Sequence, residues 1–145
     1  MVDDPQEHIT APGVPSLAPG GLAAALLGTT PSELADEELA AGLLALAELS
    51  GQVDDALARY CTAADDRSLQ RTHGALTISS WLAARSELER SRIGSLHRVG
   101  RALRACPVAS HAFRSGRLGT AKASLLVEAR KDVEDLFAEH EEMLV

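Results

Sequence analysis

The feature that most constrains the fold is a heptad stripe of mostly apolar residues between positions 39 and 64. Its members recur at alternating steps of four and three residues, which places them on one side of an α-helix. They are Leu39, Leu43, Leu46, Ser50, Val53, Leu57, Tyr60 and Ala64. Asp36 is expected to cap this helix, which is expected to end near Asp65 and Asp66. The stripe therefore predicts one straight helix roughly 40 Å long.

The heptad stripe leaves two partners open. Leu49 and Ala56 widen it beyond a strict coiled-coil seam, which favours packing within one domain. The alternative is a homodimer paired through the larger members of the stripe. These are Leu39, Leu43, Leu46, Val53, Leu57 and Tyr60.

Shorter helices are predicted after the stripe, because helix boundary signals follow one another along the chain. Thr77 or Ser79 is suited to cap a helix that runs to residue 85, and a second helix is expected over about 88–105. Pro107 is suited to open a third helix that Gly116 closes, and a fourth is expected over about 120–130. Asp132 is suited to cap a last segment, 133–144. Residues 67–76 are expected to form a loop with a turn at Gly74.

The fold class predicted from these elements is all-α. Only 3% of the 145 residues are aromatic, while Ala and Leu are abundant, which favours packed helices over sheets. We expect one long N-terminal helix packed on several shorter helices, with a helix-turn-helix-like centre. Residues 1–21, rich in Pro and Gly, are expected to form a flexible arm, and residues 22–145 a single helical domain. The core is expected to share Trp81, Leu96, Val99, Leu103 and Leu118.

The net charge of −7 conceals a strong asymmetry along the chain. Residues 1–66 hold 12 acids and one base, residues 67–122 hold 11 bases and two acids, and residues 123–145 hold seven acids and two bases. A basic middle between acidic ends is typical of a chain whose central segment meets a negatively charged partner.

Seven basic residues of this middle segment are the candidate site. Four of them lie on the predicted helix 88–105, on or next to the side opposite Leu96, Val99 and Leu103. Arginine matches the oxygens of a phosphate group, so we expect these residues to contact DNA. The alternative is that they pair with the chain's own acidic helix. The seven are Arg90, Arg98, Arg101, Arg104, Arg114, Arg117 and Lys122.

Arg92 falls on the apolar side of the same helix. We expect it either to extend toward solvent or to pair with an acid of the long helix.

Catalytic, metal and membrane functions find no support in the sequence. The five histidines have no metal-ligand spacing, and no nucleophile elbow or nucleotide loop is found, so no catalytic residue, metal or cofactor is expected. Gly116-Arg-Leu-Gly119 resembles the G-x-x-G clamp of RNA-binding KH domains, but without strands it is interpreted as the end of one helix and the start of the next. Cys61 and Cys106 are expected to be buried thiols. No apolar run is long enough to span a membrane, and the acidic start argues against a secretory signal, so the protein is expected in the cytoplasm.

The segment 33–130 resembles the actinobacterial 13E12 repeat family, a helical domain of unknown function usually found ahead of an HNH endonuclease module. The resemblance depends on a set of residues and their spacing. These are Leu34-Ala-Asp-Glu-Glu-Leu39, Gly74, Trp81-Leu82, Ala102-Leu-Arg104, Pro107, Ala112, Gly116, Leu118 and Ala121. Glu89 and Gly119 depart from it, since the family tends to have a Ser-type helix cap at both places.

The larger departure is that the family's His-Asn-His nuclease motif and cysteine pairs are missing. The chain contains no asparagine and ends at Val145. The resemblance therefore implies a truncated or split accessory portion without nuclease activity. Three functions stay open at this stage: a DNA-associated module, a protein-interaction or dimerisation module, and a degenerate remnant without independent function.

Overall fold

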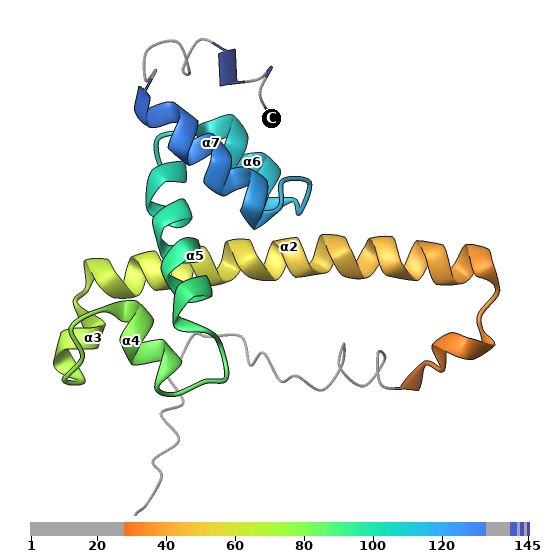
Figure 1. Ribbon diagram of the computed structural model, residues 1–145, viewed down its shortest axis with the longest axis horizontal. Coiled ribbons are helices and arrows are strands. Elements are labelled where there is room, and N and C mark those ends of the chain that lie inside the picture. The colour runs from red at the N-terminus through yellow and green to blue at the C-terminus, as the bar shows by residue number, and fades with distance from the viewer. Residues whose placement is uncertain (1–27, 133–139, 142, 144) are drawn as a thin grey trace, which may run out of the picture. The chain divides into compact units, whose positions relative to one another are not determined.

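The structure of the protein is a computed structural model, which describes residues 28–132, 140, 141, 143 and 145 (Figure 1). These residues form helices and connecting turns, and none of them lies in a strand, so the all-α fold class is confirmed. A long helix is followed by several shorter ones, also as predicted. The elements are η1 (Pro31–Glu33), α2 (Asp36–Asp66), α3 (Leu69–Thr72), α4 (Ile78–Ala83), α5 (Arg90–Leu103), α6 (Pro107–Arg114) and α7 (Thr120–Asp132).

The chain divides into two compact units, residues 1–39 and 40–145. The described part of the first unit holds η1 and the start of α2. The core and the candidate site belong to the second unit. The predicted arm 1–21 and most of the predicted segment 133–144 lie outside the described residues, and the prediction of a single domain over 22–145 stays a prediction.

Three local signals determine helix boundaries in the second unit. The Thr77 hydroxyl accepts from the backbone N–H of Ser80 at 3.1 Å, and the Ser80 hydroxyl accepts from the Thr77 N–H at 3.3 Å, which forms a capping box for α4. Pro107 is the first residue of α6. Gly116 follows α6 with a φ of +75°, a conformation that costs glycine little. The predicted roles of these three residues are confirmed.

Two boundary predictions are wrong in detail. Asp36 is the first residue of α2 and not its cap; Glu38 instead reaches back, and its Oε2 accepts from the Ala35 N–H at 3.1 Å. Residues 67–76 are not all loop, because α3 occupies Leu69–Thr72 after a left-handed Ser68. The predicted turn at Gly74 is present, with a φ of +75°.

The buried face of α2 is not the predicted heptad stripe. Its buried residues are Gly51, Asp55, Ala58, Cys61 and Thr62, most of them small. Leu43, Leu46, Val53 and Tyr60 of the heptad stripe are 43–61% exposed. Leu57 and Ala64 are the members that pack partly against the core. The expectation that the heptad stripe packs within one domain is therefore wrong for most of its length.

Glycines explain why α2 turns its small side chains inward. A Cβ on Gly100 of α5 would stand 2.7 Å from the Ala58 carbonyl oxygen and 2.7 Å from Thr62 Oγ1. A Cβ on Gly51 would stand 3.0 Å from the Cα of Gly116. The backbone of α2 thus meets α5 and the turn after α6 at close range. Large leucines on this face would hold the elements apart.

The core consists of two clusters. The larger one contains Leu96, Val99, Leu103 and Leu118, as predicted, together with Phe113 of α6. Trp81 is not part of it: the indole is partly buried against a second cluster of Cys61, Ile78 and Ile93, because α4 packs on the first turns of α5. The paired helices α4 and α5 form the predicted helix-turn-helix-like centre. Both cysteines are buried, also as predicted.

The start of α6 is capped from a distant part of the chain. Its N-cap residue, Cys106, makes no side-chain cap. The carboxylate of Glu141 accepts from the Ala109 N–H at 2.8 Å, and Glu141 itself is buried. A negative group at the positive end of a helix is stabilising, so Glu141 both satisfies a donor and complements the helix dipole.

Candidate nucleic-acid interface

All seven predicted basic residues are exposed. They fall into two groups along the chain. Arg90, Arg98, Arg101 and Arg104 lie on α5 or at its end, and Arg114, Arg117 and Lys122 lie around the turn between α6 and α7. Exposure leaves each of them accessible to a partner in solution.

Two of the seven pair with the acidic end of α2. Arg101 Nη1 lies 3.4 Å from Asp65 Oδ2, and the Arg104 guanidinium donates to both carboxylate oxygens of Asp66. The hydrogen bond from Arg104 lowers the pKa of the Asp66 carboxyl. For Arg101 and Arg104, the structure therefore shows the alternative interpretation, pairing within the chain.

These pairs do not bury the guanidinium groups. The side chains of Arg101 and Arg104 are 62% and 55% exposed. Ion pairs in such exposed positions contribute little to stability, so a phosphate oxygen can replace a carboxylate oxygen at little cost. His97 Nε2 lies 3.2 Å from Asp65 Oδ2 but outside hydrogen-bonding geometry, and adds only a charge interaction when protonated.

Arg92, which was expected on the apolar side of its helix, forms an ion pair with an acid of α2. Its Nη2 lies 2.7 Å from Asp54 Oδ1, one of the two outcomes expected for it. The other Asp54 oxygen accepts from the Thr120 hydroxyl at 2.5 Å. Asp54 therefore links α2 to α5 and to the first residue of α7. It also supplies negative charge near the start of α7, where Gly119 has no side chain to cap the helix.

The other five basic residues have no acidic partner among the described residues. Arg117 Nε donates to the Ser115 hydroxyl at 3.1 Å, a contact within its own turn. For Arg90, Arg98, Arg114 and Lys122, no side-chain hydrogen bond or ion pair is found in the part of the chain that the structure describes. These residues present unneutralised positive charge to solvent.

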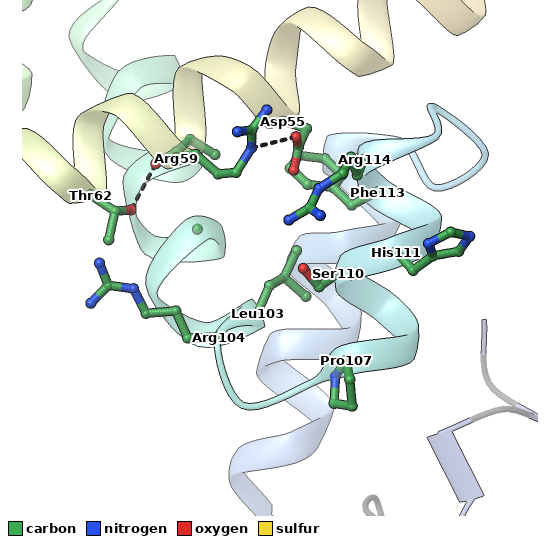
Figure 2. Close-up of a pocket in the computed structure, with 12 residues that line it drawn as sticks. Asp55, Arg59, Thr62, Leu103, Arg104, Pro107, Ser110, His111, Phe113 and Arg114 are labelled. Carbon is green, nitrogen blue, oxygen red and sulfur yellow. Dashed lines mark hydrogen bonds and ion pairs between the residues drawn. The ribbon is translucent and has the colours of Figure 1, made fainter.

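A cleft of about 600 Å³ lies between α2, the end of α5 and α6 (Figure 2). Arginines from all three elements line it: Arg59 from α2, Arg104 from the end of α5 and Arg114 from α6. Asp55 is buried in its wall and holds Arg59 Nε at 2.7 Å. Leu103 and Phe113 stand behind its wall as buried core residues, and the exposed Pro107 supplies apolar surface. His111 lines the rim, and its ring points away from the centre in Figure 2.

Arg59 is not among the seven basic residues expected from the sequence. It is the single base among the 12 acids of residues 1–66, so the charge pattern placed it with the acidic helix. The available signal was its position four residues after Asp55, which allows an ion pair on one face of a helix. Tertiary packing then brings it to Arg114, 55 positions further along the sequence.

Other kinds of site have little basis in the described residues. In this part of the chain no three His, Cys, Asp or Glu side chains form a group that would hold a metal ion. Gly116 and Gly119 end α6 and precede α7, which confirms the interpretation of this pair as a helix stop and restart. No helix among the described residues has both the length and the apolar character needed to cross a membrane.

The fold and this surface define an all-helical protein with a basic face and a basic cleft. Comparison of the chain with protein-family models, with curated proteins and with solved structures finds no match. The family resemblance described above thus remains an expectation.

Proposed function

We propose that this chain is a non-catalytic helical module that associates with DNA through its exposed arginines. The observation that supports the proposal best is the state of the seven basic residues. All seven are exposed, and of these seven only Arg101 and Arg104 have an acidic partner in the described part of the chain. Positive side chains without local partners attract the phosphate backbone and release its counterions.

The resemblance to the 13E12 repeat family supports the same proposal. That family's helical domain usually stands ahead of a nuclease module, a place suited to positioning DNA for another part of a protein. In this proposal the chain acts in the cytoplasm as an accessory portion, and no residue is assigned to catalysis.

Salt-dependent binding tests the proposal. Affinity for a fluorescent 20-base-pair duplex is measured by anisotropy at several salt concentrations. For each phosphate neutralised, the slope of log affinity against log salt is expected to be about −0.9. The double variant Arg90→Gln/Arg98→Gln is expected to make this slope less steep by about 1–2.

A matched control uses two exposed arginines outside the seven, Arg67 and Arg71. Arg67→Gln/Arg71→Gln removes the same charge and is expected to leave the slope close to that of the unmodified chain. No binding at low salt, or equal effects of the two double variants, would refute DNA contact through this face.

The exposed heptad stripe favours a second candidate function, self-association. Leu43 and Tyr60 are 61% exposed and Val53 is 48% exposed, a large apolar area for one helix face. The heptad spacing suits a second helix, and the occupant that we propose is α2 of another copy. The positions that lie directly beside the heptad stripe, on either side of it between residues 40 and 63, hold small or apolar residues apart from Asp54. Asp54 already binds Arg92 and Thr120. Two acidic helices can therefore approach without like charges facing each other across the seam.

Molar mass in solution tests the second candidate. Light scattering is expected to show a dimer, and Leu43→Glu/Val53→Glu is expected to give a monomer with unchanged helix content. Ala41→Glu/Ala45→Glu, which adds the same charge at exposed positions outside the stripe, is the control and should remain dimeric. A monomeric unmodified chain at high concentration would exclude this candidate.

A further inference from the structure

We propose that the cleft between α2, α5 and α6 binds the phosphate group of a phosphate ester, held by Arg59, Arg114 and Ser110. The inference rests on the proposed function only in taking DNA as one source of that ester. The other source is a free nucleotide.

The charge of the cleft selects an anion. Arg59, Arg104 and Arg114 line it together with a single acid, Asp55. Each guanidinium can donate two parallel hydrogen bonds to an oxyanion. Asp55 balances the charge of Arg59 and Asp66 balances that of Arg104, so the positive charge of Arg114 is in excess. Because the arginines come from three different helices, packing of the second unit is what assembles this group.

The existing contacts divide the three arginines into two kinds. Arg104 is occupied, since its terminal nitrogens donate to Asp66. Arg59 uses Nε for Asp55 at 2.7 Å, so its two terminal nitrogens stay available while the carboxylate fixes the position of the side chain. Arg114 has no recorded partner among the described residues. Arg59 and Arg114 are therefore the pair suited to a ligand, with Asp55 as the positioning residue.

A neutral donor accompanies the two arginines. Ser110 lines the cleft from α6, one turn before Arg114, and its hydroxyl has no hydrogen bond in the described part of the chain. The other hydroxyl in the wall, Thr62 Oγ1, already donates to the Ala58 carbonyl at 2.7 Å. Ser110 can thus give a third hydrogen bond to a phosphate oxygen.

The size and walls of the cleft favour an ester over free phosphate. A volume of about 600 Å³ is in the range of small-molecule sites and exceeds the need of one phosphate ion. Pro107, which is exposed, lines the same cleft and offers apolar surface to a sugar or a base. The ligand class is therefore a nucleoside phosphate, either free or at an end or exposed position of DNA.

Titration calorimetry with three small probes tests this site in the full chain. The probes are deoxyadenosine monophosphate, deoxyadenosine and inorganic phosphate. The monophosphate is expected to bind most tightly, inorganic phosphate more weakly, and deoxyadenosine not measurably. Arg114→Gln and Ser110→Ala are each expected to weaken the monophosphate, Arg114→Gln by at least about tenfold.

Arg59 needs a compensated variant, because removing it alone leaves the buried Asp55 carboxylate unpaired. Arg59→Gln/Asp55→Asn keeps this pair neutral and is expected to lose binding as Arg114→Gln does. Arg71→Gln, a charge change outside the cleft, serves as the control and is expected to bind like the unmodified chain.

The outcomes separate the cleft from the proposed DNA face. Equal affinity for the monophosphate and deoxyadenosine, or unchanged affinity in both arginine variants, would overturn the cleft site. In that case salt-dependent DNA binding through Arg90 and Arg98 can still hold. If the monophosphate binds as expected but the duplex does not bind at low salt, the DNA proposal fails and the site takes free nucleotides. A 5′-phosphorylated duplex that binds more tightly than its unphosphorylated form, only while Arg59 and Arg114 are present, would identify DNA ends as the source.

Discussion

Replacing Gly116 by alanine tests the close approach on which the second unit depends. A Cβ at this position would overlap the Glu48 carbonyl oxygen of α2 and stand 3.0 Å from the Glu48 Cγ. The clash involves helix backbone, so it is relieved only if α2 or the turn after α6 moves. Overpacking of this kind costs about 1–3 kcal/mol, and the left-handed conformation costs an alanine roughly 1–2 kcal/mol more.

Gly74 provides a control that separates these two costs. It has the same φ of +75°, but a Cβ there meets nothing within 4 Å. Gly74→Ala therefore carries only the conformational cost, and the smaller entropy of the unfolded chain, worth about 0.4–1 kcal/mol, favours both variants equally. The difference between the two variants is expected to be about 1–3 kcal/mol.

Urea denaturation followed by circular dichroism at 222 nm measures both variants. For a unit of this size, each kcal/mol lowers the melting temperature by roughly 4–8 °C, so thermal unfolding gives a second measurement. If Gly116→Ala is no less stable than Gly74→Ala, the turn does not lie against α2, and both the buried face of α2 and the wall of the cleft would need to be reconsidered.

Three further predictions follow from packing and charge. The added methyl group of Gly94→Ala in α5 meets open space, so this variant is expected to stabilise the fold by up to about 1 kcal/mol. Gly100→Ala is expected to lose that gain, because its Cβ would stand 2.7 Å from the Ala58 carbonyl oxygen. Equal unfolding free energies of the two variants would contradict the crossing of α2 and α5. Burial raises the pKa of the Cys61 thiol, so iodoacetamide at pH 8 is expected to label it slowly in the folded chain and fast in urea. The unfolding free energy is expected to fall as the pH rises above the ordinary thiol pKa of roughly 8.5. Rapid labelling of the folded chain would show that the second cluster is open. Arg104 lowers the pKa of Asp66, so the small stability from this pair is present above roughly pH 4 and lost as the pH falls through the lower folded value. Asp66→Asn is therefore expected to differ from the unmodified chain in urea midpoint at pH 7, and this difference is expected to shrink as the pH falls below roughly 4. A difference that does not change with pH would exclude this origin.

Local chemistry explains why several helix boundaries were predictable. The Thr77 hydroxyl caps the nearby Ser80 amide. Pro107 cannot continue a helix but can start one, and Gly116 tolerates a positive φ. Each of these effects acts over a few residues and is independent of the rest of the molecule. The error at Asp36 arises where neighbouring polar residues compete for the same helix end, since Glu38 binds the Ala35 N–H there.

The candidate site was predictable only in part, because local effects determine only some of its features. Composition and spacing indicated a basic middle segment and which arginines lie on the outer side of α5. They did not indicate that Asp65 and Asp66 would come to Arg101 and Arg104, or that Arg59 would join Arg114 in a cleft. Ion pairs between residues more than 30 positions apart depend on how helices cross.

The sequence by itself determined that this protein is helical, where most of its helices begin and end, and that its charge is segregated along the chain, since these properties follow from near neighbours and composition. Only the tertiary structure decided which face of α2 is buried. Apolar periodicity selected the leucine stripe, but close backbone contact with Gly100 and Gly116 required the small side chains of the opposite face. That choice left the heptad stripe exposed and brought three arginines together around one cleft.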